Sequence, residues 1–284
     1  MVKLLLNSIA LDPNRWTKDK IPYFRLERLL AAIADAGFRF IEVWQYHISE
    51  ESGPGIERIR ALADSLGLSM PVVGLYPQLH LTGDEHERHM ANVKNLIGAA
   101  ATLGAEVVKI FVGSRASALL SQAEYERSVG CVKELMSLAG AHDLIVTGEM
   151  HQKTLLDTIE SCERLIVDVG DKRFKICFQP FDLRDTEQAL RDFDRVAKDA
   201  LHVHYQGRRE KKMELLENSD LDYRRLTQAL AAHDFRGYIC LEFTKDCVVE
   251  RPEEFKLRTV LENARRDREF VLRIAQDVNM EIVA

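Results

Sequence analysis

The sequence lacks the features that mark several large classes of protein. No apolar stretch approaches the roughly 20 residues that span a bilayer, and the apolar run at the start is too short for a signal peptide. No long basic run is present, and the formal net charge is -6, which disfavours tight general binding to nucleic acid or anionic membranes. We therefore expect neither a nucleic acid nor a membrane as a partner.

Cysteine is scarce, and its spacing excludes a disulfide framework. The five cysteines are widely separated, odd in number and mostly in apolar surroundings, and no CxxC pair exists. This pattern predicts reduced thiols in the core of a cytoplasmic protein, and it disfavours both disulfides and a zinc knuckle.

Glycine-rich turns that bind nucleotides are also missing. A doubly wound open sheet normally carries such a turn after its first strand, but residues 7–12 contain no glycine. The P-loop motif is absent as well. No linker rich in proline, glycine or serine divides the 284 residues, so we predict one domain over residues 1–284.

The chain alternates short β-rich runs with amphipathic helices. The predicted strands are Val2–Ile9, Arg39–Trp44, Ser69–Tyr76, Val107–Val112, Leu144–Met150, Phe174–Gln179, Leu201–Tyr205 and Tyr238–Phe243. The predicted helices are Phe24–Ala36, Ile56–Leu66, Asp84–Leu103, Ser121–Ala141, Thr154–Val169, Asp185–Ala200, Asp222–His233 and Pro252–Asp277, and a charged loop is predicted over residues 206–219. This alternation in a chain of this length predicts an α/β fold, a single (β/α)8 TIM barrel.

Side-chain alternation selects the residues that face the barrel interior. Successive side chains of a strand point to opposite faces, and active sites of these barrels lie at the C-terminal ends of the strands. Four consecutive strands then direct Glu149, Gln179, His204 and Glu242 to one place. Two carboxylates, one imidazole and one amide oxygen are suitable ligands for a divalent cation.

The expected ion follows from the oxygen-rich ligand set. Hard oxygen ligands with a single histidine suit Mn²⁺ or Mg²⁺, while Co²⁺, Fe²⁺ and Zn²⁺ are compatible with the same residues. The alternative is a polar cluster without metal, neutralised by Lys109 or Lys175. Spacing alone leaves both interpretations open.

These residues, taken in order, resemble the xylose isomerase-like TIM barrels, which include sugar isomerases and epimerases, inosose dehydratases and endonuclease IV. The resemblance covers essentially the whole chain, and each motif is weak alone. The motifs are Phe40-Ile-Glu-Val-Trp44 with His47, Val108-Lys-Ile-Phe-Val-Gly113, Gly148-Glu-Met-His151 followed by Thr154-Leu-Leu-Asp-Thr158, His202-Val-His204, and Cys240-Leu-Glu242.

The resemblance implies a ligand set. Ketose epimerases of this superfamily hold their metal with a Glu, an Asp, a His and a Glu at successive strand ends, which implies Glu149, His204 and Glu242 here. Gln179 stands where the family usually has Asp, so the site loses one negative charge unless Asp182 compensates. The resemblance also implies that Glu149 and Glu242 are the catalytic acid and base.

Further residues near the barrel mouth are candidate substrate contacts. They are Trp44, His47, Lys109, His151 and Arg208. Lys109 could instead form a core ion pair with Glu42 or Glu149, and Trp44 could be plain packing. The spacing after the seventh strand does not distinguish Arg208 from Arg209, and this charged run could also be a solvated loop.

The residues and the resemblance together predict a divalent-metal-dependent sugar isomerase or epimerase that transfers a proton next to a carbonyl. A dehydratase of the 3-dehydroshikimate or inosose type is the alternative, because it begins with the same proton abstraction. A non-catalytic sugar-binding barrel and an endonuclease IV-like nuclease are less favoured. The expected partner is a small carbohydrate, cyclic polyol or keto acid. Apolar residues of the last helix, such as Phe270, Leu272 and Ile274, suit packing either on the barrel base or on a second subunit, so a homo-oligomer is one of two expectations.

Overall fold

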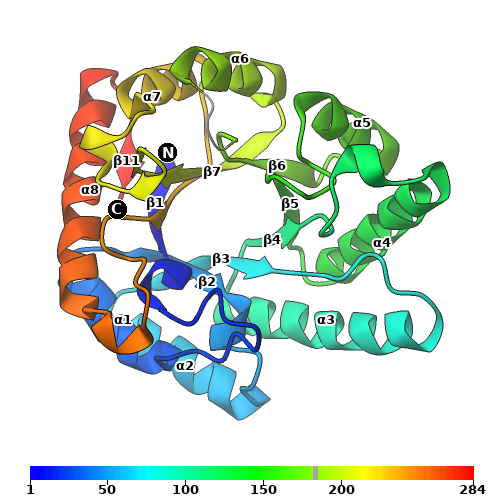
Figure 1. Ribbon diagram of the computed structural model, residues 1–284. Coiled ribbons are helices and arrows are strands. Elements are labelled where there is room, and N and C mark those ends of the chain that lie inside the picture. Colours follow the sequence, from blue (N-terminus) through cyan, green and yellow to red (C-terminus); the bar gives the residue numbers. More distant parts are fainter. Residues whose placement is uncertain (182–184) are drawn as a thin grey trace.

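A closed barrel of parallel strands surrounded by helices forms the computed structural model, which describes residues 1–181 and 185–284 (Figure 1). The strand order around the barrel is β1, β2, β3, β4, β5, β6, β7 and β10, and β10 closes the barrel by pairing with β1. Neighbouring barrel strands are parallel throughout. The structure therefore confirms the predicted (β/α)8 barrel.

The elements alternate along the chain as predicted. The barrel strands are β1 (Val2–Asn7), β2 (Phe40–Trp44), β3 (Ser69–Leu75), β4 (Val107–Phe111), β5 (Ile145–Glu149), β6 (Phe174–Phe178), β7 (Ala200–Gln206) and β10 (Tyr238–Phe243). The outer helices are α1 (Leu26–Asp35), α2 (Gly53–Ser65), α3 (Gly83–Leu103), α4 (Gln122–Gly140), α5 (Ile159–Val169), α6 (Thr186–Val196), α7 (Tyr223–Ala232) and α8 (Leu257–Asp277).

Local hydrogen bonds explain where the helices begin. Ser121 and Glu124 form the capping box expected from their spacing, because each side chain accepts a hydrogen bond from the other residue's backbone N–H. Helix α5 begins later than predicted, because Thr158 forms an equivalent pair with Ser161 and so marks the true start. Helix α3 ends as expected at Gly104, whose φ of 80° suits a glycine.

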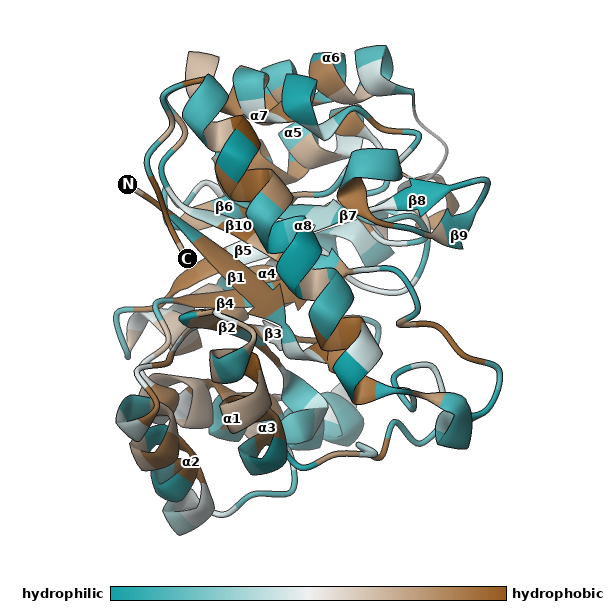
Figure 2. Ribbon diagram, turned by 90° about the vertical axis from the view of Figure 1, so that its left-hand side faces the viewer, coloured by the Kyte–Doolittle hydropathy of each residue, from teal (hydrophilic) through white to brown (hydrophobic). Residues whose placement is uncertain are grey.

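Two small strand pairs were not predicted. The charged segment after β7 forms an antiparallel hairpin of β8 (Arg208–Arg209) and β9 (Lys212–Met213), which is hydrophilic and projects from the barrel (Figure 2). Both turn residues, Glu210 and Lys211, have positive φ, as a two-residue hairpin turn requires, but neither is the glycine or asparagine that usually signals it. At the C-terminus, β11 (Ile282–Val283) pairs with β1.

The apolar core lies mostly between the strands and the outer helices. A second, smaller cluster contains Leu5, Val72, Val107, Tyr238 and Cys240, which alternation places inside the barrel. Cys240 of this cluster is the register partner of His204, so the apolar interior residues meet the polar inward residues at this level of the barrel. All five cysteines are free and buried, as expected. Within the described residues, no helix is both long enough and apolar enough to cross a membrane.

A buried carboxyl group joins α8 to the barrel. Asp267 is 1% exposed, and it accepts hydrogen bonds from Leu216 N at 2.8 Å and from Thr244 Oγ1 at 2.5 Å. Burial raises the pKa of Asp267 to about 7, although these hydrogen bonds oppose the shift. On the same helix, Phe270 and Ile274 are buried in the main core.

Asp267→Asn should flatten the dependence of stability on pH. Because the folded state raises the pKa of Asp267, it binds this proton more tightly than the unfolded chain does. The stability that this group contributes is therefore fully present below about pH 4 and is lost as pH rises through about 7. Ionising this group costs up to roughly 4 kcal/mol. Urea unfolding across this range should show a smaller decline for Asp267→Asn than for the wild type.

A matched control is Asp64→Asn, because Asp64 is exposed and pairs with Arg60 on the same helix. Its unfolding free energy should follow the wild-type pH profile. Parallel profiles for the wild type and Asp267→Asn would contradict the assignment.

Candidate active site and metal centre

Four side chains, here called the mouth cluster, meet at the C-terminal end of the barrel: Glu149, Gln179, His204 and Glu242. Glu149 ends β5, Gln179 follows β6, and the other two lie in β7 and β10. Nδ1 of His204 is 2.8 Å from Oε1 of Gln179, 3.4 Å from Oε2 of Glu242 and 3.9 Å from Oε1 of Glu149. All four residues are buried.

The Gln179 amide can serve this cluster in two orientations. With its nitrogen inward, it donates to Nδ1 of His204 at 2.8 Å, Oε2 of Glu242 at 2.9 Å and Oε1 of Glu149 at 3.3 Å. With its oxygen inward, the amide faces only acceptors. A cation among these atoms would stabilise the second orientation, because adjacent ligands of an octahedral ion at ~2.1 Å lie about 3 Å apart. The four residues therefore fit a divalent cation.

A fifth side chain, Glu42 of β2, fixes the orientation of the histidine. Nε2 of His204 lies 3.1 Å from Oε2 of Glu42 and can donate its proton there, which leaves Nδ1 free to face the mouth cluster. Burial opposes ionisation of Glu42, but His204, His202 and Lys109 together hold its pKa well below the usual range. From the sequence, Glu42 is predicted only as a partner of Lys109, although the alternation of side chains along β2 also points it inward.

Lys109 lies between two of the buried carboxylates. Its Nζ donates to Oε2 of Glu149 and is 3.6 Å from Oε1 of Glu42, and the lysine is 1% exposed. Burial alone would lower the pKa of Lys109, but Glu149 and the neighbouring acidic groups raise it well above its usual value. Lys109 thus forms the core ion pair that the sequence left as an alternative, directly beside the mouth cluster.

Aromatic side chains line the β2–β5 part of the mouth. The rings of Trp44, Tyr46, Tyr76, Phe111 and His151 follow one another with centroid distances of 4.9, 6.1, 4.9 and 4.8 Å. Trp44 is buried, whereas His151 is partly exposed. Sequence reasoning selected the two ends of this arc and missed the three rings between them, because single aromatic residues carry no signal of mutual contact.

His47 contacts Trp44 at one end of this arc and two polar side chains of the segment that follows β1. Its Nδ1 is 3.0 Å from Oγ of Ser8, and its Nε2 is 3.4 Å from Oδ2 of Asp12. The Trp44 ring meets the His47 ring edge-on at 5.3 Å. The imidazole is therefore engaged with neighbouring side chains and supports the position of Trp44.

A cavity of about 310 Å³ adjoins the mouth cluster and is lined by Arg208 and Lys211, among others. Gln206 connects the two regions: its Oε1 accepts from Nη2 of Arg208 at 3.2 Å, and its Nε2 can donate to the Gln179 amide oxygen at 3.3 Å. Arg209 is exposed and does not line this cavity. Asp182, the suggested compensating carboxylate, lies outside the described residues.

A (β/α)8 barrel with buried acids, an imidazole and an amide at its C-terminal mouth defines a class in which active sites occupy that end of the barrel. Within that class, residues 30–268 match the family described as the xylose isomerase-like TIM barrel. The chain therefore belongs to this family.

Solved structures with the same fold include sugar epimerases and a dehydratase. A D-psicose 3-epimerase is 18% identical with a TM-score of 0.76, covering 96% of this chain and 99% of that chain. The probable 3-DHS dehydratase AsbF from Bacillus anthracis is 19% identical with a TM-score of 0.72, covering 92% and 97%. A xylose isomerase-like TIM barrel protein from Mycobacterium smegmatis, solved with magnesium, is 16% identical with a TM-score of 0.74, covering 97% of each chain.

One curated relative is more similar in sequence over a shorter range. The 3-dehydroshikimate dehydratase of Bacillus anthracis is 26% identical over 144 residues, which are 49% of this chain and 51% of that protein. The match thus spans about half the length of this relative.

Lys109→Met should destabilise the fold, because it leaves Glu149 and Glu42 buried without their shared cation. Removing one partner of a buried ion pair costs about 3–5 kcal/mol. Urea unfolding at neutral pH measures this loss.

Lys175→Met is the matched control, because Lys175 also lies on a barrel strand but is partly exposed, with Asp199 3.5 Å away. Its cost should stay within about 1 kcal/mol. Equal losses of unfolding free energy in the two variants would show that the buried ion pairs of Lys109 stabilise the fold no more than the partly exposed pair of Lys175 does.

Proposed function

We propose that this chain is a divalent-metal-dependent isomerase or epimerase that moves a proton at the carbon next to a carbonyl of a small polyhydroxy substrate. The observation that carries the proposal is the convergence of two buried carboxylates, Glu149 and Glu242, on Nδ1 of His204 from separate strands. One carboxylate can remove a proton, and the other can return a proton to the opposite face of the same carbon.

The mouth cluster is also the proposed cation site, with Glu149, Gln179, His204 and Glu242 as ligands. A cation held there would polarise the substrate carbonyl and stabilise negative charge beside it. Three oxygen donors and one imidazole favour Mn²⁺ or Mg²⁺. The Mycobacterium smegmatis relative solved with magnesium supports this preference.

The neighbouring residues have distinct proposed roles. Lys109 donates a hydrogen bond to Glu149 and so fixes the position of the carboxylate that is proposed to accept the proton. Trp44 and His151 present ring faces or edges to the apolar C–H groups of a sugar, with His47 positioning Trp44 from behind. Arg208 binds hydroxyl or carboxylate oxygens of the substrate in the adjoining cavity.

A dehydratase of the 3-dehydroshikimate type is the second candidate, and the 26% identical relative favours it. The cavity beside the mouth cluster is lined by the cationic side chains of Arg208 and Lys211 and by one acidic residue, Asp220, so cationic groups that suit a substrate carboxylate are in the majority. Both reactions start when a carboxylate removes a proton next to a ketone. In the dehydratase, the neighbouring C–O bond then breaks, and the hydroxyl leaves as water after receiving a proton from an acid.

Metal content provides the first test of the mouth cluster. Wild-type protein loaded with Mn²⁺ should retain about one ion at this site, and His204→Ala should lose it, because the variant removes the nitrogen ligand. His233→Ala is the control, since His233 pairs with Asp194 on the surface. The proposal fails if the wild type neither retains nor is thermally stabilised by Mn²⁺, Mg²⁺, Co²⁺ or Zn²⁺.

Proton exchange in D₂O provides the test of chemistry. The wild type is incubated in D₂O with each of a panel of ketoses and with 3-dehydroshikimate. We expect deuterium at the carbon next to the carbonyl in the compound that is its substrate. Glu149→Gln and Glu242→Gln should each lower product formation by roughly 10²–10⁴, the usual contribution of a general acid or base. Glu106→Gln, which changes a carboxylate paired with Lys3 away from the mouth cluster, is the control.

The product identifies the reaction class. A ketose recovered with inverted configuration supports the epimerase, and an unsaturated product with loss of water supports the dehydratase. Full activity in both glutamine variants would contradict the assignment of these carboxylates.

A further inference from the structure

We propose that a second metal-binding site lies deeper inside the barrel, formed by Glu42, His202 and Cys240, with Nε2 of His204 as its fourth donor. These residues are here called the inner cluster, and the ion expected there is of the Zn²⁺ or Co²⁺ class. This inference goes beyond the proposed function and does not depend on it.

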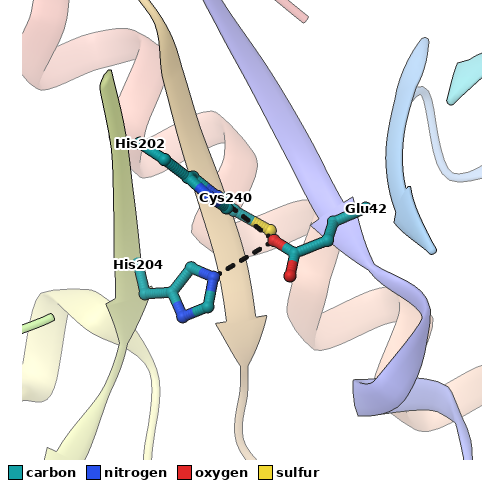
Figure 3. Close-up of side chains that lie close together, drawn as sticks. All are labelled: Glu42, His202, His204 and Cys240. Carbon is teal, nitrogen blue, oxygen red and sulfur yellow. Dashed lines mark hydrogen bonds and ion pairs between the residues drawn. The ribbon is translucent and has the colours of Figure 1, made fainter. Parts of the chain in front are cut away.

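The inner cluster is assembled by β2, β7 and β10 (Figure 3). Cys240 of β10 is the register partner of His204 of β7. His202 lies two residues before His204 on β7, so it points inward as well. The Glu42 carboxylate points toward these side chains from across the barrel (Figure 3). All four residues are fully buried.

The distances suit a tetrahedral ion. One donor atom from each residue lies within 4.8 Å of all the others. Oε2 of Glu42 is 3.1 Å from Nε2 of His202 and 3.1 Å from Nε2 of His204. Ligands at ~2.0–2.3 Å from a shared tetrahedral ion lie about 3.3–3.8 Å apart. This spacing is slightly longer than the 3.1 Å contacts of Glu42 and shorter than the 4.8 Å limit within which all four donor atoms lie.

Two groups of the inner cluster have unmet hydrogen-bonding capacity. Within residues 1–181 and 185–284, the two ring nitrogens of His202 and Oε1 of Glu42 make no hydrogen bond, although Nζ of Lys109 lies 3.6 Å from that oxygen as an ion pair. The 3.1 Å approach of His202 Nε2 to Glu42 is an ion-pair contact without hydrogen-bond geometry. Buried polar groups are normally hydrogen-bonded, and a coordinated cation would engage both the imidazole and the carboxylate.

The donor types differ from those of the mouth cluster. A thiolate, two imidazoles and one carboxylate select Zn²⁺ or Co²⁺ over Mg²⁺, whereas the mouth cluster offers three oxygens and one nitrogen. His204 faces the mouth cluster through Nδ1 and the inner cluster through Nε2. On binding an ion, the Cys240 thiol loses its proton to solvent, and the sulfur becomes the anionic ligand. When both clusters hold an ion, His204 also releases its remaining ring proton to solvent and bridges the two ions as an imidazolate.

Cobalt spectroscopy on the full chain tests this site. Because the inner cluster is fully buried, Co²⁺ is supplied during growth as well as to the purified protein. A Co²⁺–thiolate bond gives an intense near-ultraviolet charge-transfer band, which Co²⁺ held by oxygen and nitrogen alone lacks. We expect this band in the wild type and its loss in Cys240→Ser, while the Co²⁺ held at the mouth cluster remains.

Cys177→Ser is the matched control, because Cys177 is another buried inward thiol, on β6 beside His202. It should retain the band. The proposal is overturned if Co²⁺-loaded wild type shows no thiolate band, if the band survives in Cys240→Ser, or if it disappears in Cys177→Ser. Glu42→Gln, which should weaken the band, serves as a second variant if Cys240→Ser fails to fold by circular dichroism.

Glu149→Gln separates this proposal from the proposed function. The substitution should impair the mouth cluster and proton exchange but leave the thiolate band intact. Wild-type activity without the band would overturn the inner site alone, and Glu42 would then serve only to orient His204. A thiolate band without activity on any ketone tested would support the inner site and count against the proposed function.

Discussion

Burial of Glu42, Glu149 and Glu242 within one barrel interior is the constraint on which the rest of the site depends. An isolated ionised carboxylate in such surroundings is prohibitively costly, so each needs a cation or several hydrogen bonds. Lys109 compensates Glu149 and Glu42 together, and His204 stands between Glu42 and Glu242. The charges form a network in which each carboxylate shares a cationic or imidazole partner with another carboxylate.

The barrel makes this arrangement possible by holding two environments in one interior. Apolar side chains such as Leu5, Val72 and Val107 occupy part of this interior. Parallel neighbouring strands then bring their polar C-terminal residues to the same level. Because these groups are held by strands, their positions are set before a substrate arrives, which favours catalysis by preorganised charge.

Epimerases and a dehydratase share this fold, and the proposed chemistry explains how one scaffold serves both. In the proposed chemistry, both reactions begin when a carboxylate removes a proton next to a carbonyl. The second step depends on whether the substrate has a leaving group beside the new carbanion and on how the loops hold it. The hairpin β8–β9 and the cavity lined by Arg208 lie beside the mouth cluster on the β7 side. Fold similarity alone does not select between the two reactions.

The sequence by itself determined the alternation of strands and helices, the barrel and the inward parity of the mouth cluster, because these follow from local periodicity. It also placed the bounds of β10 correctly. Only the tertiary structure decided that Lys109 bridges Glu149 and Glu42, and that His204 presents a different nitrogen to each cluster. These contacts join distant strands, and the distances across a barrel depend on its closure, which no local pattern encodes.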